Sequence, residues 1–146
     1  PFEDLVWISD EVTRLRSQGY LPIVTFQYQE DYLVTAQSAA IRDFRKVADS
    51  GAVIVNGSQS HVSKAMEFWN HTFIHYGLGN LFFDQPEVYI THDGIIQKHF
   101  FYQGRHISTQ LLTITLEETA KPRLMSSEER QKFLDDLFEA SRLLKE

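Results

Sequence analysis

Residues 49–62 read DSGAVIVNGSQSHV, and this stretch decides the predicted fold. Gly51 is expected to end a helix, because a glycine just past the last turn readily adopts the left-handed backbone that closes it. Ala52–Val55 is a short apolar run, typical of a strand buried on both faces in a parallel sheet. The polar turn Asn56–His61 follows directly, and ligand sites in open α/β sheets lie beyond the carboxyl ends of strands. This turn is therefore a candidate site, and the alternative is a turn that only connects two elements.

A second strand and polar loop lie upstream. Leu21–Phe26 is predicted to be a strand, and the polar and aromatic loop Gln27–Tyr32 follows it. Thr35–Ala48 has an apolar stripe at helical spacing, which predicts an amphipathic helix. The charged positions of this helix expected to face water are Arg42, Asp43, Arg45 and Lys46. A strand, a helix and a strand in this order form a βαβ unit with parallel strands, so both polar loops should lie at one edge of the sheet.

The segments around this unit carry simpler patterns. We expect a helix over Asp10–Gln18, a short helical segment over Ser63–Glu67 and a strand over Thr72–Tyr76. Asp84–Pro86 interrupts the pattern. The aromatic pairs and runs further along are expected in the core: Phe82, Phe83, Phe100, Phe101 and Tyr102.

The remainder changes to β-rich sequence. Glu87–Thr91, Gly94–Tyr102 and Gln110–Leu116 predict an antiparallel meander. Lys121–Arg123 is expected to be a linker, and Ser126–Glu129 opens a last helix that runs to about Leu144. Its inward positions are expected to be Phe133, Leu137, Phe138 and Leu144. We accordingly divide the chain into residues 1–120 and a linker and helix, 121–146, that pack on the same domain.

The amino-acid composition excludes several classes of function. The chain has 146 residues, 42% of them hydrophobic, which is enough to bury a core. The net charge of −6 gives no basic footprint for nucleic acid. No apolar run approaches the roughly 20 residues of a membrane-spanning helix. The absence of cysteine excludes disulfides, thiolate zinc sites and a cysteine nucleophile. The first residue is proline, so we expect a mature or cut piece of a longer chain.

Three motifs resemble one family. They are ADSGAVIVNGSQSHV at residues 48–62, Glu67, and IHYGLGNLFFD at residues 74–84. Together they are similar to the bacterial capsule synthesis family related to poly-γ-glutamate synthesis proteins, whose pattern reads approximately AGAD-V-GHHPHV, a Glu, and YSLGNF-FD. Residues 24–32 lie where the family has a His-Trp-Gly-x-Glu-Tyr segment, and Lys121–Arg130 is similar to extensions in some members, so the resemblance extends over nearly the whole chain.

The resemblance implies a fold, a compartment and a cofactor. It implies the carboxyl-terminal portion of a four-layer α/β/β/α sandwich, similar to calcineurin-like metallophosphoesterases. It further implies a divalent metal, Mn, Zn, Fe or Mg, held partly by an amino-terminal half that this chain lacks and that would be its partner. The expected role is synthesis, attachment or processing of an extracellular anionic polymer at the bacterial cell envelope, with anchoring through the preceding segment. Metal-activated water would hydrolyse a phosphoester or amide.

The chain departs from the family pattern at the metal positions. Gln27 stands where the first loop has a histidine, and Ser58 and Gln59 stand where the paired histidines would be, which leaves His61. A glutamine oxygen is a weaker donor for Zn, Mn or Fe than an imidazole nitrogen. The site therefore either holds a harder ion through oxygens or is a metal-free pocket that binds polymer or a partner.

The candidate residues follow from these arguments. The expected pocket consists of Gln27, Tyr28, Asp31, Gln59 and His61. His61, Gln59 and Gln27 are the candidate metal ligands, and His61 and Asp31 are the catalytic candidates. Glu67 and Asn80 are expected to support the loop backbone. A solvated loop charge is the alternative for Asp31.

Overall fold

The computed structural model describes residues 5–83, 87, 89–118 and 120–145. Its helices are α1 (Leu5–Ser17), α2 (Ser38–Asp49) and α3 (Ser127–Arg142), with short 3₁₀ segments η2 (Tyr89–His92) and η3 (Leu143–Lys145). Its strands are β1 (Ile23–Phe26), β2 (Ile54–Gly57), β3 (Met66–Trp69), β4 (Thr72–His75), β5 (Asp93–Tyr102), β6 (Arg105–Glu117) and β7 (Lys121–Leu124). In these residues we find no helix that combines the length and the apolar character needed to cross a bilayer.

The βαβ unit is confirmed. The first sheet has the strand order β1-β2-β4-β3, in which β1, β2 and β4 are parallel and β3 runs antiparallel to β4. Ile23 aligns with Ile54, and Ile54 aligns with Phe73, so the three parallel strands are in close register. Their carboxyl ends therefore lie at one edge of the sheet, and their amino ends at the other.

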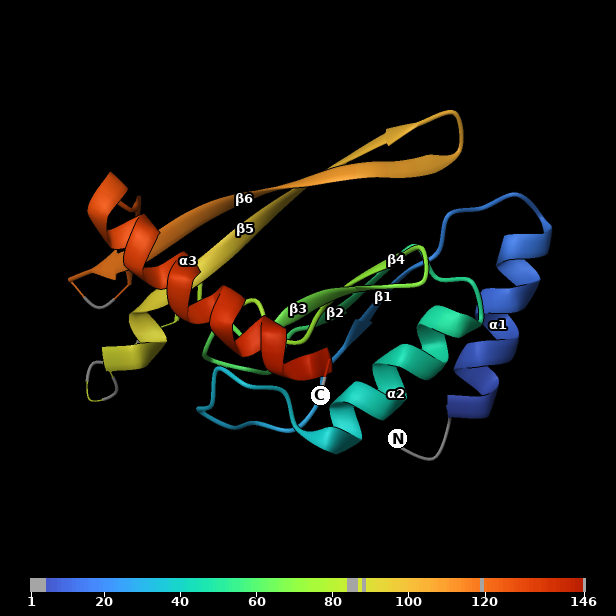
Figure 1. The fold of residues 1–146 in the computed structure, drawn as a ribbon, viewed down its shortest axis with the longest axis horizontal. Coiled ribbons are helices and arrows are strands. Elements are labelled where there is room, and N and C mark those ends of the chain that lie inside the picture. The colour runs from blue at the N-terminus through green and yellow to red at the C-terminus, as the bar shows by residue number, and fades with distance from the viewer. Residues whose placement is uncertain (1–4, 84–86, 88, 119, 146) are drawn as a thin grey trace.

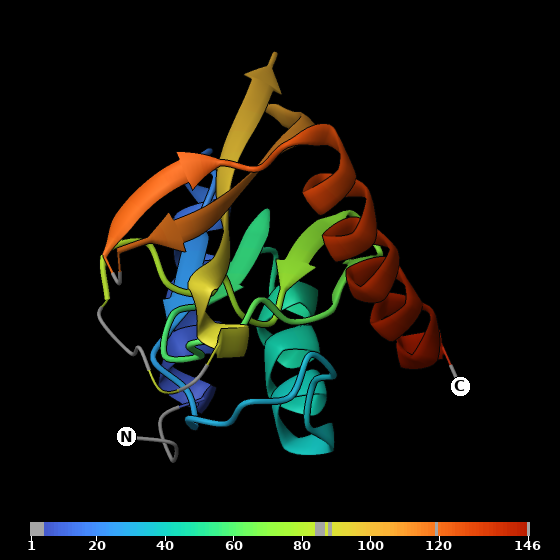
Figure 2. The ribbon, with the colours of Figure 1, turned by 90° about the vertical axis from the view of Figure 1, so that its left-hand side faces the viewer.

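The first sheet is buried on both faces. Val55 and Ile74 pack against α1 and α2, whereas their neighbours Ile54 and Phe73 pack toward β5 and α3. Successive side chains of a strand point to opposite faces, so adjacent apolar residues serve two cores. Figures 1 and 2 show the resulting layers, with α1 and α2 on one side of the sheet and the β5–β6 hairpin on the other. The mixed α/β fold predicted from the sequence is confirmed.

The second sheet is an antiparallel meander of β5, β6 and β7. It joins the first sheet through an isolated bridge between Gly79 and Gly94, and a Cβ at Gly94 would overlap the Asn80 carbonyl group. Glycine at position 94 thus lets β5 lie against the backbone of Asn80. The predicted turn at Gln103–Gly104 is confirmed, since it connects β5 to β6.

Two helix predictions were wrong, one in where the helix begins and one in its existence. α1 begins at Leu5 rather than Asp10, and the Ser9 carbonyl accepts a hydrogen bond of 2.8 Å from Thr13 Oγ1 inside the helix. Ser63–Glu67 is not helical. The backbone there bonds to distant segments instead: Lys64 N donates to Gly77 O at 2.9 Å, and Ala65 N donates to Val34 O at 2.8 Å. These long-range bonds consume the donors that a helix would use.

Other local predictions differ in the carboxyl-terminal third. Tyr89–His92 is a 3₁₀ segment, not a strand, and Asp84–Pro86 lies outside the described residues. The expected linker contains β7, which pairs with β6 at the edge of the second sheet, where proline is tolerated because one side of an edge strand needs no donor. The exposed fractions of Phe101 and Phe138 are 41% and 47%, so neither is a core residue. Phe82, Phe83, Phe100 and Tyr102 are also exposed.

α3 opens with the capping box expected from the sequence. Ser126 accepts from the backbone of Glu129, whose side chain accepts in return from the Ser126 backbone. Further along, Leu137 is buried, and Ser141 Oγ accepts a hydrogen bond of 2.9 Å from Met66 N on β3. The helix therefore packs on the first sheet. The division of the chain at residue 120 stays a prediction.

Candidate functional site

The two polar loops meet at the carboxyl edge of the first sheet. Gln27 follows β1 and Gln59 follows β2, and the Gln27 amide Nε2 donates to Gln59 Oε1 at 2.7 Å. Ser58 N also donates to Phe26 O at 2.8 Å, which ties the second loop to the end of β1. Parallel pairing of β1 and β2 explains this meeting, because it brings the two strand ends side by side. We call the region formed by residues 27–37 and 58–64 the carboxyl-edge cleft.

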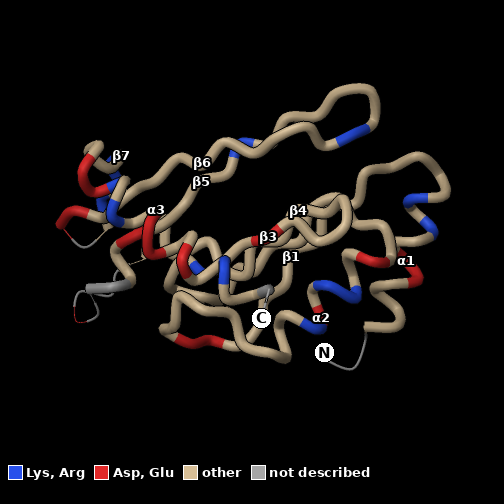
Figure 3. Tube along the Cα trace, viewed as in Figure 1, with Lys and Arg blue, Asp and Glu red and all other residues tan. Residues whose placement is uncertain are grey.

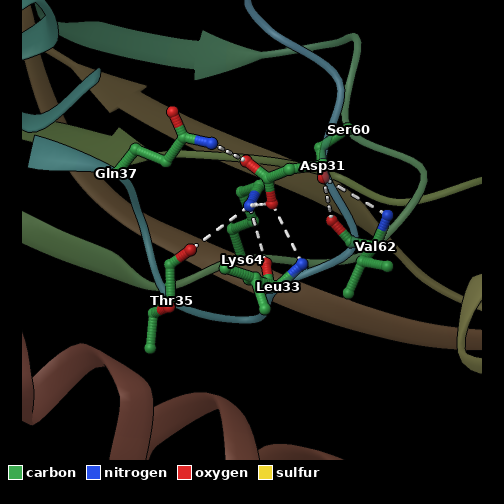
Figure 4. A network of polar contacts seen from close by, with 7 residues as sticks. All are labelled: Asp31, Leu33, Thr35, Gln37, Ser60, Val62 and Lys64. Atoms are coloured by element: carbon green, nitrogen blue, oxygen red, sulfur yellow. Dashed lines mark hydrogen bonds and ion pairs between the residues drawn. The ribbon is translucent and has the colours of Figure 1, made fainter. Parts of the chain in front are cut away.

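Lys64 is the central cation of this cleft. Its side chain is 5% exposed, and its ammonium group forms an ion pair with Asp31, whose side chain is 16% exposed. The same ammonium donates to Leu33 O at 2.6 Å and Thr35 O at 3.2 Å, so its three N–H groups are used. Figure 4 shows these bonds meeting at the Lys64 ammonium group.

Both carboxylate oxygens of Asp31 accept hydrogen bonds. Besides the ammonium of Lys64, Asp31 Oδ1 accepts from Leu33 N at 2.9 Å and Oδ2 accepts from Gln37 Nε2 at 2.9 Å. An acid–base group needs an oxygen available to substrate. In this structure Asp31 bonds three groups of the loop and of Lys64, and its catalytic role stays a prediction. The solvated loop charge offered as the alternative is wrong, because the side chain is mostly buried and paired with Lys64.

His61 has a defined orientation. Its Nδ1 lies 2.8 Å from Asn80 Oδ1, so this nitrogen carries the proton and donates to the amide oxygen. Nε2 then points toward Glu30, whose Oε1 is 3.5 Å away. Tyr32 stacks on one side of the imidazole and Phe83 contacts it from 4.7 Å between ring centroids. His61 is thus clamped with one nitrogen facing the cleft.

Tyr28 lies deeper in the cleft and reaches α2. Its hydroxyl donates to Asp43 Oδ2 at 2.7 Å, and burial together with this carboxylate raises the pKa of Tyr28 to about 12. The phenol is therefore protonated at neutral pH. Asp43 is only 5% exposed, which corrects the expectation that it faces water. The reason is tertiary: the aromatic ring of Tyr28 packs beside Phe44 and carries its hydroxyl to the helix.

The two residues predicted to support the loops have different partners. Asn80 bonds His61, whereas Glu67 bonds Arg45 and Tyr76. Glu67 forms a two-pronged ion pair with Arg45, with both N–O distances at 2.8 Å, and accepts from Tyr76 Oη at 2.5 Å. Burial and this bond raise the pKa of Tyr76. Glu67 thereby links β3, β4 and α2 beneath the cleft.

The donor set does not fit a transition metal. Gln27 and Gln59 bond each other, Asp31 binds an ammonium group, and one nitrogen of His61 is used by Asn80. Across the described parts of the chain, no three His, Asp or Glu side chains gather in a way that could hold a metal ion. The cavity beside Asp31 and Gln59 measures about 10 Å³, room for one water molecule.

Sequence reasoning missed Lys64. The only local signal is a lysine followed by the apolar pair Ala65 and Met66, three residues after His61, which is compatible with a buried cation. Tyr32 and Phe83, which enclose His61, were also not assigned to it. Their contacts join segments far apart in the sequence, so no spacing rule could identify them.

The part of the chain that carries the two loops matches a protein family. Residues 3–85, more than half of the chain, match the family described as bacterial capsule synthesis protein PGA_cap, and the chain belongs to this family. The matched range contains the parallel strands and both cleft loops. β5, β6, β7 and α3 lie beyond it.

One characterised relative is similar over a shorter range. PGA biosynthesis protein CapA of Bacillus subtilis (strain 168) is 37% identical over 60 residues, which is 41% of this chain and 16% of CapA. The similarity therefore spans a small part of that relative's length.

Proposed function

We propose that the chain takes part in the synthesis, attachment or processing of an extracellular anionic polymer of the poly-γ-glutamate kind, at the bacterial cell envelope. Family membership and the similarity to a protein named for PGA biosynthesis support this role. We further propose that residues of this chain bind polymer rather than catalyse a reaction. The observation that supports this second step is that the polar groups of the carboxyl-edge cleft bond one another, because Gln27 bonds Gln59 and Lys64 pairs with Asp31.

The alternative is a metal-dependent hydrolase built on a metallophosphoesterase-like sandwich. The orientation of His61 favours it, because a metal-binding histidine commonly donates its other nitrogen to an acceptor such as Asn80. The helix, sheet and sheet layers are also compatible with three of the four layers of such a sandwich. Against it, Gln27 and Gln59 would have to break their mutual bond to reach a metal.

Metal and polymer binding can be measured together. The protein is incubated with Mn²⁺ or Zn²⁺, desalted and analysed for metal, and then titrated with a labelled oligomer of γ-linked glutamate. We expect no stoichiometric metal, binding of the anionic oligomer, and no binding of a length-matched neutral oligomer of γ-linked glutamine. Tightly bound metal together with metal-dependent hydrolysis of a phosphoester or amide would favour the hydrolase instead.

A further inference from the structure

A second polar region lies at the opposite edge of the first sheet, beside the amino ends of β2 and β4. It is a groove of about 550 Å³, within the usual size range of ligand pockets. Its side chains include Arg16, Phe68, Asn70, His71, Arg105 and His106. They come from the end of α1, from β3 and the β3–β4 turn, and from the start of β6. We call this region the amino-edge groove.

The lining of the amino-edge groove is basic. It contains two arginines and two histidines, and no aspartate or glutamate is among its described lining residues. An acidic residue, Asp49, lines an adjoining pocket, where its Oδ1 accepts from Trp69 Nε1 at 2.8 Å and Asn70 Nδ2 at 2.9 Å. Asp49 therefore fixes the β3–β4 turn that carries His71. Figure 3 shows basic residues near the hairpin tip and at α1, where acidic residues also lie.

Two of the four basic side chains that line the groove have no bonding partner among the described residues. In the part of the chain that the structure describes, the side chains of Arg105 and His71 form no hydrogen bond or ion pair. Arg16 makes a single bond of 3.2 Å to Tyr20 O. Most other arginines form ion pairs: Arg123, for instance, bonds both Glu117 and Glu129. The groove thus retains donors that suit carboxylates, because a guanidinium group binds a carboxylate through two parallel bonds.

One wall of the groove is aromatic. The side chain of Phe68 is 66% exposed, and the His106 imidazole stacks on it with centroids 6.4 Å apart. His106 is held in turn by Thr109 Oγ1, 2.9 Å from its Nε2. A chain of carboxylates separated by methylene groups would match this surface, with charge on the arginines and hydrocarbon on the ring.

We propose that the amino-edge groove binds a segment of polycarboxylate chain through Arg105, His71 and Arg16. The occupant is the anionic polymer of the proposed function, on which this inference rests. The groove is a binding site distinct from the carboxyl-edge cleft, on the other edge of the same sheet. Polymer would be held by paired carboxylate contacts and by packing on Phe68, so binding should weaken as salt concentration rises.

The test compares a groove variant with a charge-matched control. The groove variant carries Arg105→Gln and His71→Gln, two exposed side chains without internal partners, so its fold should be preserved. The control carries Lys121→Gln on β7. Each is titrated by fluorescence anisotropy with a labelled oligomer of γ-linked glutamate and with an oligomer of α-linked aspartate. We expect the groove variant to bind the glutamate oligomer about tenfold more weakly or worse, and the control to stay within about twofold of the unmodified protein.

The outcomes distinguish failure of the groove proposal from failure of the proposed function. If the groove variant binds the glutamate oligomer as tightly as the unmodified protein does, the groove is not the site, while the polymer role stands. If the protein binds only the aspartate oligomer, and only with the groove intact, the polycarboxylate site stands and the assignment to a γ-glutamate polymer fails. Binding of neither oligomer overturns both.

Discussion

The two polar regions of the chain differ in what their side chains contact. At the carboxyl edge, Lys64, Asp31, Gln27 and Gln59 bond one another around a cavity of about 10 Å³. At the amino edge, Arg105 and His71 face a groove of about 550 Å³. A region can be rich in hydrogen-bonding groups and still have little capacity left for a ligand. In open α/β sheets a ligand site is expected beyond the carboxyl ends of the strands. In this chain the available hydrogen-bond donors instead lie in the amino-edge groove.

The largest effect is expected from Lys64→Met in the carboxyl-edge cleft. This change leaves the Asp31 carboxylate buried without its cation, which should lower the free energy of unfolding by about 3–5 kcal/mol. Urea unfolding followed by circular dichroism measures it. Combining Lys64→Met with Asp31→Asn should restore part of the loss, because no unpaired charge remains. A Lys64→Met protein as stable as the unmodified one would mean that the cleft is not held by this pair.

Acid should destabilise the fold through His75, which is fully buried at the end of β4. Its Nε2 lies 3.0 Å from Lys64 O, and desolvation lowers the pKa of His75 to about 4. The unfolded chain, with a pKa near 6.5, binds the proton first. Stability should therefore fall as pH decreases from 6.5 to 4, by about 3 kcal/mol in total.

The variant His75→Gln tests this assignment by urea unfolding at several pH values. It should flatten the dependence between pH 6.5 and 4. The control His71→Gln, at an exposed position in the amino-edge groove, should leave the dependence as it is. An equal slope in His75→Gln and the unmodified protein would assign the acid sensitivity to other groups.

A smaller effect is expected from Gln27→Ala. Gln27 is exposed, so loss of its bond to Gln59 should cost at most about 1 kcal/mol. Thermal unfolding measures this cost, and Gln59→Ala serves as the partner variant. If the two single changes and the double change all cost the same, the bond itself accounts for the effect. A cost of several kcal/mol would show that the amide pair is a main support of the cleft.

The smallest effect on stability is expected from Arg105→Gln. This side chain has no bonding partner in the described chain, so the free energy of unfolding should change by less than about 0.5 kcal/mol. Its effect should appear in polycarboxylate affinity alone. Lys64→Met should have the opposite effect, because Lys64 stabilises the fold, whereas Arg105 is available to a ligand. Clear destabilisation by Arg105→Gln would remove that distinction.

Local sequence patterns predicted much of the architecture. The apolar run before Asn56, the amphipathic helix and the capping box at Ser126 each depend on neighbours within a few positions. They correctly gave the βαβ unit, the last helix and two strands of the meander, whereas the segment predicted as its first strand contains the 3₁₀ segment Tyr89–His92. Where they failed, at Ser63–Glu67 and at Lys121–Arg123, the backbone bonds to distant strands, and long-range pairing overrides local preference.

The sequence by itself determined that two polar loops follow neighbouring parallel strands, because a βαβ unit leaves no other arrangement for their ends. Only the tertiary structure decided which polar groups are already bonded. It buried Lys64 against Asp31, and it left Arg105 beside His71 without an internal partner. The physical reason is that burial and pairing depend on contacts between segments far apart in the chain, which no local spacing encodes.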